Sequence, residues 1–163
     1  MIKNRPLTTD LIGEKTIKTD EKINFFGDVD ELSAFMMEFT HYTQNDELNE
    51  KIIEIIKTLS QILAEVAGGK NKVSVESLSS LVNLCGFYEK KVGGFKQLVL
   101  PGKTLKGAKA HVLRTITRRC ERAYAKVYEK YGGSEIIFEY LNKLSTLFYH
   151  IARIYDENKI DNI

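Results

Sequence analysis

The sequence contains little of what several protein classes require. It has no tryptophan, two prolines and two cysteines in 163 residues. So few prolines argue against a turn-rich β-sandwich, and two cysteines cannot build the dense disulfide framework of a small secreted domain. No segment approaches the roughly 18 consecutive apolar residues of a membrane span, and the first residues contain no apolar signal-peptide core. We therefore expect a cytoplasmic protein in which Cys85 and Cys120 are buried, reduced thiols.

The chain also lacks a strong net charge. Its 24 lysines and arginines oppose 22 aspartates and glutamates, which leaves a formal charge of +2. A nearly balanced charge gives no broad basic footprint for nucleic acid, so any anion binding must come from local clusters. Hydrophobic residues make up 43% and charged residues 28%, a globular composition. We predict one domain over residues 1–163, with residues 1–24 as an irregular N-terminal segment.

The apolar residues are spaced three and four positions apart, which predicts helices and no sheet. Ser74 is a candidate N-cap, and glycine pairs follow three of the helices and are expected to end them. The last helix repeats its apolar residues with the seven-residue spacing of a bundle seam. The fold class is therefore all-α. The five predicted helices cover residues 25–42, 46–67, 74–92, 105–131 and 134–155.

The fourth predicted helix has an apolar side and a charged side. Three arginines separated by four residues repel one another on an exposed helix, so we expect an acidic group or a phosphate to face them. Arginine, rather than lysine, favours bidentate contact with such groups. A solvated basic face is the alternative. The expected apolar stripe is Leu105, Ala108, Val112, Ile116, Cys120, Ala123 and Val127. The charged side is His111, Arg114, Arg118, Glu121 and Arg122.

An acidic run in the first predicted helix supplies a candidate partner for the arginines. Asp30 lies off the core face of that helix, on a side that also carries Ala34 and Met37. This half-apolar second face favours contact with another subunit, whereas the alternative is that acidic residues near a helix start complement its dipole. Asn142, beside the seam of the fifth helix, is a candidate for a polar contact in the core or with a ligand.

Two other kinds of site are disfavoured by spacing. Gly102-Lys103-Thr104 ends like a phosphate-binding loop, but Gln97 stands where the first glycine belongs and no βα unit precedes it. Thr104 is instead expected to cap a helix whose free N–H groups are able to hold an anion. Glu38-x-x-His41 has the spacing of a di-iron ligand pair, but the chain has no second copy of it.

Six segments occur in a characteristic order along the chain. They are Lys18-Thr-Asp20, Gly27-Asp-Val-Asp-Glu-Leu-Ser33, Leu98-Val-Leu-Pro-Gly102, the stretch from His111 to Arg122, Tyr140-Leu-Asn-Lys-Leu-Ser145 and Ala152-Arg153. Together they resemble one known family, the propanediol-utilisation type of ATP:corrinoid adenosyltransferase. The resemblance covers nearly the whole chain. It implies a ferritin-like, cobalamin adenosyltransferase-like five-helix bundle that forms a homotrimer with active sites at subunit interfaces. It also implies transfer of the 5′-deoxyadenosyl group of ATP to cob(I)alamin, giving adenosylcobalamin and triphosphate.

The resemblance also implies roles for particular residues. Asp30 is expected to pair with Arg114 across the subunit interface, and these two act with Arg118 as the catalytic group. Leu98 is expected to face the corrin, and Mg²⁺ to bridge the ATP phosphates without a protein side chain as ligand. The implied ATP-binding residues are Lys18, Arg118, Glu121 and Asn142, together with Lys3, Thr8 and Thr9.

The N-terminal segment departs from the family pattern. The family opens with a loop of the form Thr-x-x-Gly-Asp-x-Gly-x-Thr, whereas this chain has no glycine before Gly13. Leu98 stands where the family often has phenylalanine, and Lys22 where it usually has arginine. These differences leave two alternatives open: a non-catalytic corrinoid- or nucleotide-binding relative that acts as a carrier or regulator, and an unrelated helical interaction module.

Overall fold

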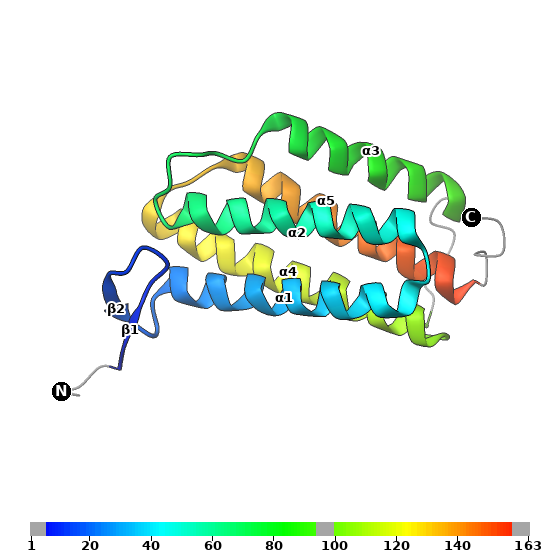
Figure 1. Cartoon of the computed structure of the whole chain (residues 1–163), viewed down its shortest axis with the longest axis horizontal. Helices are drawn as coiled ribbons and strands as arrows, with labels where there is room; N and C mark the ends of the chain where they lie inside the picture. The colour runs from blue at the N-terminus through cyan, green and yellow to red at the C-terminus, as the bar shows by residue number, and fades with distance from the viewer. Residues whose placement is uncertain (1–5, 94–99, 158–163) are drawn as a thin grey trace.

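The computed structural model describes residues 6–93 and 100–157, and in this part of the chain five helices form an elongated bundle (Figure 1). The prediction of an all-α five-helix bundle is confirmed. The helices are α1 (Glu21–Thr43), α2 (Asp46–Val66), α3 (Val75–Val92), α4 (Leu105–Tyr131) and α5 (Glu135–Asp156).

Capping side chains fix the starts of α1 to α4, whereas Ser134 before α5 makes no side-chain capping hydrogen bond. Ser74 and Thr104 are N-caps as predicted, and their hydroxyls accept hydrogen bonds from the backbone N–H groups three residues later. Helix α1 begins four residues earlier than its apolar pattern indicated, because Asp20 caps it and accepts a hydrogen bond from the backbone of Lys22 at 2.9 Å. A polar first turn carries no apolar periodicity, so the sequence pattern missed it.

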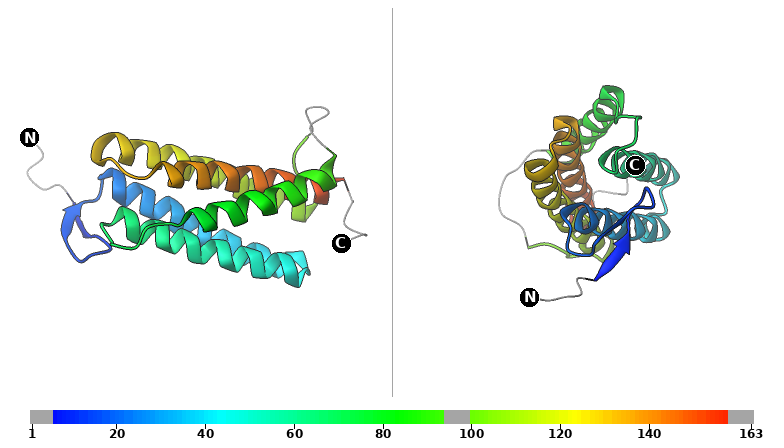
Figure 2. Two further views of the ribbon diagram at one scale, coloured as in Figure 1. Left: turned by 90° about the horizontal axis from the view of Figure 1, so that it is seen from above. Right: turned by 90° about the vertical axis from the view of Figure 1, so that its left-hand side faces the viewer.

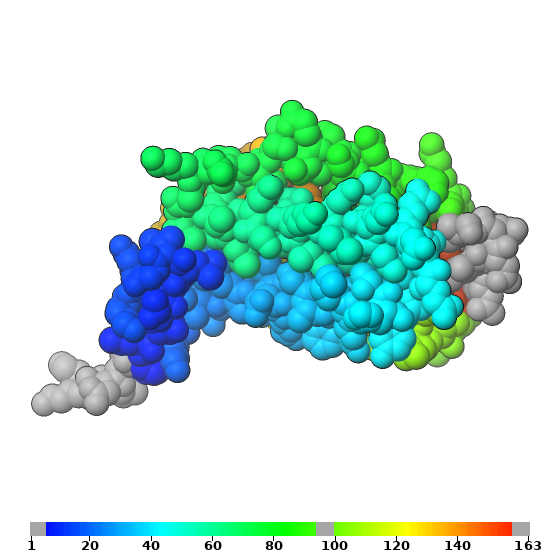
Figure 3. Space-filling model, viewed as in Figure 1, coloured from blue at the N-terminus to red at the C-terminus, as the bar shows by residue number. Residues whose placement is uncertain are grey.

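The expectation that residues 1–24 are irregular is wrong for part of this segment. Strands β1 (Leu7–Thr9) and β2 (Lys15–Ile17) form an antiparallel hairpin in which Thr8 lies opposite Thr16. The hairpin projects from the end of the bundle where α1 begins (Figure 3). Strands of three residues are too short to show an alternating pattern in the sequence.

Helix α4 lies between two neighbours. It packs against α1 on one side and α5 on the other, while α3 packs against α5 and α2 against α1 (Figure 2). The predicted apolar faces of α1 and α5 are buried, as expected for the walls of a bundle core. On α1 these residues are Val29, Leu32, Met36 and Phe39, and on α5 they are Ile137, Leu141, Leu144, Phe148, Ile151 and Tyr155.

The predicted apolar stripe of α4 is partly wrong. Leu105 is 63% exposed and Val112 is 44% exposed, whereas Ala110, Leu113 and Tyr124 are buried instead. Because α4 contacts both α1 and α5, its buried side is wide, and the sequence alone does not distinguish the side that meets the core from a second apolar side.

Both thiols are free and buried, as predicted. Burial raises the pKa of the Cys120 thiol to about 12, which keeps it protonated and unreactive. In the two ranges that the structure describes, no helix is both long and apolar enough to cross a membrane.

Candidate active site on helix α4

The predicted charged side of α4 forms an outward-facing surface. Arg118 and Arg122 are exposed, and neither guanidinium has an ion pair within the described residues. His111 is only 8% exposed, and Arg114 is half-buried. Along this surface the side chains therefore change from a buried histidine near the start of α4 to exposed arginines at its middle.

Three of the predicted ATP-binding residues are brought together. The side-chain amide of Asn142 on α5 donates a hydrogen bond to the carboxylate of Glu121 on α4 at 3.2 Å. Arg118 precedes Glu121 by three residues and so lies one helical turn away on the same side of α4. The guanidinium, the carboxylate and the amide thus line one strip along the junction of α4 and α5.

Asp30 and Arg114 are not paired within one chain. Asp30 is exposed on α1, and its carboxylate has no ion pair or hydrogen bond in the described part of the chain. The Nε atom of Arg114 is buried and has no hydrogen-bond partner among the described residues. A buried guanidinium nitrogen without a partner is costly, so a partner outside these residues is expected.

Sequence reasoning missed Arg119. Its Nε donates to Asp28 of α1 at 3.0 Å, and its terminal nitrogen pairs with Glu31. The acidic run in α1 is therefore divided, because Asp28 and Glu31 pair with an arginine of their own chain whereas Asp30 does not. The available signal was the i, i+3 spacing of Asp28 and Glu31, which places both carboxylates on one side of α1.

A cleft of about 500 Å³ lies between α1 and α4 beside this surface. Carboxylates from α1 and cations from α4 line it, so its two walls carry opposite charge. The lining residues are Glu21, Asn24, Asp28, Arg119, Arg122, Ala123 and Lys126.

The hairpin residues lie at one end of the bundle. Thr9 accepts a hydrogen bond from Lys15 Nζ at 2.8 Å, Thr8 is half-buried, and Lys18 is exposed. The turn between the strands is closed by Asp10, whose carboxylate accepts hydrogen bonds from the backbone N–H groups of residues 12 and 14. Lys3 and Leu98, the other predicted contacts, lie outside the described residues.

The hairpin and the arginines of a single chain are far apart. The base of the hairpin is fixed to the end of α4 by an ion pair of Asp20 with Lys130 at 2.9 Å. Arg118 lies twelve residues before Lys130, which corresponds to about 18 Å along a helix. One chain therefore does not bring Lys18, Thr8 or Thr9 to Arg118.

The base of the hairpin is further tied by aromatic and charged groups. Lys22 lies over the ring of Tyr131, 4.8 Å from its centroid. Burial acts to raise the pKa of Asp20, but hydrogen bonds from Tyr131 and Lys130 outweigh it, so the pKa is lowered. The resulting anion stabilises the junction of β2, α1 and α4.

The predicted anion-holding position at the start of α4 is already filled. Thr104 caps α4 as expected. However, the carboxylate of Asp156 from α5 accepts hydrogen bonds from the backbone N–H groups of Gly102 and Thr104. This start of α4 is therefore occupied by a side chain of the same chain.

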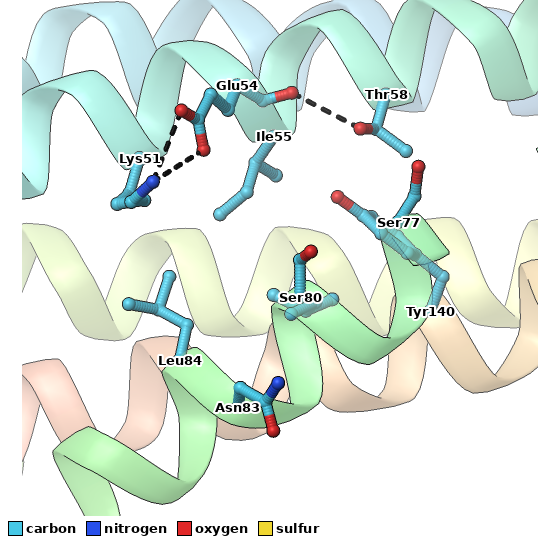
Figure 4. Close-up of a pocket in the computed structure, with 10 residues that line it drawn as sticks. Lys51, Glu54, Ile55, Thr58, Ser77, Ser80, Asn83, Leu84 and Tyr140 are labelled. Carbon is cyan, nitrogen blue, oxygen red and sulfur yellow. Dashed lines mark hydrogen bonds and ion pairs between the residues drawn. The ribbon is translucent and has the colours of Figure 1, made fainter. Parts of the chain in front are cut away.

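A second groove, of about 460 Å³, lies between α2 and α3 and contains none of the predicted site residues (Figure 4). Lys51 and Glu54, both on α2, form an ion pair at its rim with a distance of 2.9 Å. Hydroxyl groups of Thr58, Ser77 and Ser80 also border it. Its charges are thus paired with each other.

Comparison with known proteins identifies the class. A family model described as cobalamin adenosyltransferase matches residues 7–155, so the chain belongs to the cobalamin adenosyltransferase family. It is 31% identical to a corrinoid adenosyltransferase of Citrobacter freundii over 155 residues, which cover 90% of this chain and 88% of that protein. It is 30% identical to a corrinoid adenosyltransferase of Bacillus subtilis over 154 residues, covering 90% and 80%.

Solved structures show the same fold. A variant of a PduO-type ATP:corrinoid adenosyltransferase from Lactobacillus reuteri, complexed with ATP, has a TM-score of 0.79 and 27% identity and covers 94% of this chain and 90% of that chain. A second variant of that protein, complexed with cobalamin and ATP, has a TM-score of 0.81 at 24% identity, with coverage of 94% and 87%.

Proposed function

We infer that this chain transfers the 5′-deoxyadenosyl group of ATP to cob(I)alamin, producing adenosylcobalamin and triphosphate. Family membership along 7–155 supports this activity, as do relatives named corrinoid adenosyltransferases and a solved PduO-type structure complexed with ATP. The observation on this chain that carries it is the strip of Arg118, Glu121 and Asn142, whose guanidinium is free to meet a polyanion.

For this reaction the protein must neutralise the charge of the leaving triphosphate and position ATP. The electron pair of cobalt(I) forms the bond to C5′ of ATP, and the bond from C5′ to oxygen breaks. Triphosphate leaves with the electron pair of that C5′–O bond. The nucleophile belongs to the corrinoid, so no side-chain nucleophile is needed. Arg118 neutralises the charge that grows on the departing triphosphate, while Glu121 and Asn142 hold ATP beside it. Mg²⁺ would be held by the ATP phosphates and would neutralise part of their charge, while Arg118 and Lys18, as cations, would contact the phosphates and not the metal.

The site is completed by a second copy of the chain, in a homotrimer. Asp30 of one subunit pairs with Arg114 of the next, which satisfies the buried Nε atom that has no partner within the described residues. Lys18, Thr8 and Thr9 of one subunit then reach the ATP held by Arg118 of another, whereas within one chain the base of their hairpin lies about 18 Å along α4 from Arg118.

Exposed apolar side chains support such an assembly. Met37 on α1 is 42% exposed and Val112 on α4 is 44% exposed. An ion pair of Glu38 with Lys109 at 2.8 Å keeps them within about one turn of each other along the two helices. An apolar patch next to unpaired charges is typical of a subunit contact. A cytoplasmic location is part of the same proposal, because the free thiols suit a reducing compartment.

An anaerobic turnover assay tests the activity. The protein is mixed with chemically reduced cobalamin, ATP and Mg²⁺, and the corrinoid spectrum is followed against an enzyme-free control. We expect adenosylcobalamin to form at a rate that depends on ATP. Corrinoid or ATP binding without product would favour the non-catalytic carrier or regulator, and the absence of all binding would favour the helical interaction module.

A further inference from the structure

The last residue of α5 holds the start of α4 in place. The Asp156 carboxylate accepts a hydrogen bond from Gly102 N at 2.9 Å and another from Thr104 N at 3.0 Å. The Thr104 hydroxyl donates to the backbone carbonyl of Tyr155 at 3.3 Å, which fastens the same junction a second time. Figure 1 shows this junction at the end of the bundle opposite the hairpin.

The surrounding residues are shaped to admit this carboxylate. A side-chain carbon added at Gly107 would lie 2.0 Å from one Asp156 oxygen, so only glycine leaves room at that position. Gly102 has a φ of 84°, a conformation that glycine adopts without strain. Asp156 is only 7% exposed, and the N–H groups at a helix start are well suited to a buried anion.

The same carboxylate borders the charged side of α4. His111 Nε2 lies 3.4 Å from Asp156 Oδ2, which is long for a hydrogen bond. His111 is one turn before Arg114 on α4. Asp156 therefore connects three parts of the molecule: the end of α5, the turn formed by Leu100, Pro101 and the residues up to Thr104, and the first part of the arginine-bearing side.

The turn that Asp156 holds presents an apolar side chain to the outside. Leu100 is 78% exposed, the largest exposed fraction among the large hydrophobic residues of the described chain. It lies two residues after Leu98 in the sequence, the residue expected to face the corrin. A corrin ring offers a broad apolar face that such a side chain is able to cover.

We propose that Asp156 is a positioning residue for the corrinoid. By holding the Leu100–Thr104 turn against α5, it fixes the exposed side chain of Leu100 where it meets the corrin. Asp156 does not contribute to ATP binding. This inference rests on the proposed adenosyl transfer. Replacing the carboxylate releases the turn, so the cost falls on the corrinoid and not on ATP, whose contacts lie farther along α4 and α5.

The first test separates the two substrates. In Asp156→Asn, we expect the KM for cob(I)alamin to rise about tenfold, while the KM for ATP stays within about twofold of the wild-type value. The matched control is Glu65→Gln, which alters another buried carboxylate that holds a loop, through Val73 N at 2.7 Å, near the opposite end of the bundle. Equal changes in both KM values, or the same split in Glu65→Gln, would overturn the inference.

The second test reports on the turn without turnover. Trypsin cleavage after Lys103 requires the turn to open, so we expect Asp156→Asn to be cut there about tenfold faster than wild type and Glu65→Gln at the wild-type rate. An unchanged cleavage rate would also overturn the inference. If wild-type protein forms no adenosylcobalamin, the proposed function fails, whereas faster cleavage in the variant still establishes that Asp156 holds the turn. If Asp156→Asn does not fold, Thr104→Val loosens the same turn more gently and is expected to give the same split with a smaller rise.

Discussion

The outer side of α4 and the groove between α2 and α3 both carry charged side chains, but these two regions differ in whether the charges are paired with each other. In the groove, Lys51 and Glu54 neutralise each other at 2.9 Å. On α4, Arg118 is free and the buried Nε of Arg114 has no hydrogen-bond partner among the described residues. Paired surface charges need nothing more, whereas unpaired arginines on a packed helix point to a partner from outside the chain.

The same contrast exists within one turn of α1. Asp28 and Glu31 are paired with Arg119, and Asp30 between them is not. Neighbouring residues of the same chemical type thus divide into a pair that joins α1 to α4 and a single carboxylate that is available to a second subunit. Each of the following changes tests one side of this comparison.

The largest effect is expected for Arg118→Ala. In the proposed reaction the Arg118 guanidinium stabilises the charge of the departing triphosphate, so its loss should lower kcat/KM by about 10²- to 10³-fold. Steady-state formation of adenosylcobalamin measures it. Arg118→Lys should recover part of the rate, because it restores the charge without the bidentate geometry. A rate within a few-fold of wild type in Arg118→Ala would remove this residue from the catalytic group.

The next effect concerns assembly. Asp30→Lys should dissociate the proposed trimer, because it would set a cation against Arg114 of the neighbouring subunit. Combining Asp30→Arg with Arg114→Asp should restore the proposed pair. Sedimentation velocity distinguishes the species. The control is Asp28→Asn, which weakens only the partly exposed contact with Arg119 of the same chain and should cost less than about 1 kcal/mol of unfolding free energy. Dissociation in Asp28→Asn but not in Asp30→Lys would contradict the division of the acidic run.

A smaller effect is expected from acid. Burial lowers the pKa of His111, with Arg114 lowering it further and Asp156 opposing, and burial also lowers the pKa of His150. An unfolded chain takes up these protons near pH 6.5, but the folded chain does so only at lower pH. The unfolded state then binds more protons, so stability falls as the pH drops below about 6.5.

Urea unfolding at several pH values measures this dependence. His150→Leu should flatten the loss of stability on the acid side, because it removes one of the two buried imidazoles. His41→Gln, at an exposed position of α1, is the matched control and should leave the slope as in wild type. An equal flattening in both variants would exclude the buried histidine as the cause.

The smallest effect is expected at the groove. Lys51→Ala removes an exposed ion pair within one helix, so neither the free energy of unfolding nor the rate of adenosyl transfer should change measurably. Urea unfolding and the turnover assay check both. A loss of activity here would mean that the groove takes part in the reaction and would break the comparison between the two surfaces.

The five helices and the caps of α3 and α4 were predictable because they depend on local spacing. Ser74 and Thr104 each cap a helix through their own hydroxyl, and the seam of α5 follows from a repeat within one helix. The side of α4 that meets the core was only partly predictable, since Leu105 and Val112 belong to an apolar side that stays exposed. Which apolar side is buried depends on where α1 and α5 pack, and no local pattern contains that.

The sequence by itself determined the bundle class, the family resemblance and the residue types of the candidate site. Periodicity, capping and the order of motifs can all be read from the linear sequence. Only the tertiary structure decided how those residues are used. It paired Arg119 with Asp28, left Asp30 without a partner among the described residues, and brought Asp156 to the start of α4 across 52 positions of sequence. These contacts join residues that are distant in the sequence. They form only when the helices pack against one another in a particular register, which local sequence patterns do not specify.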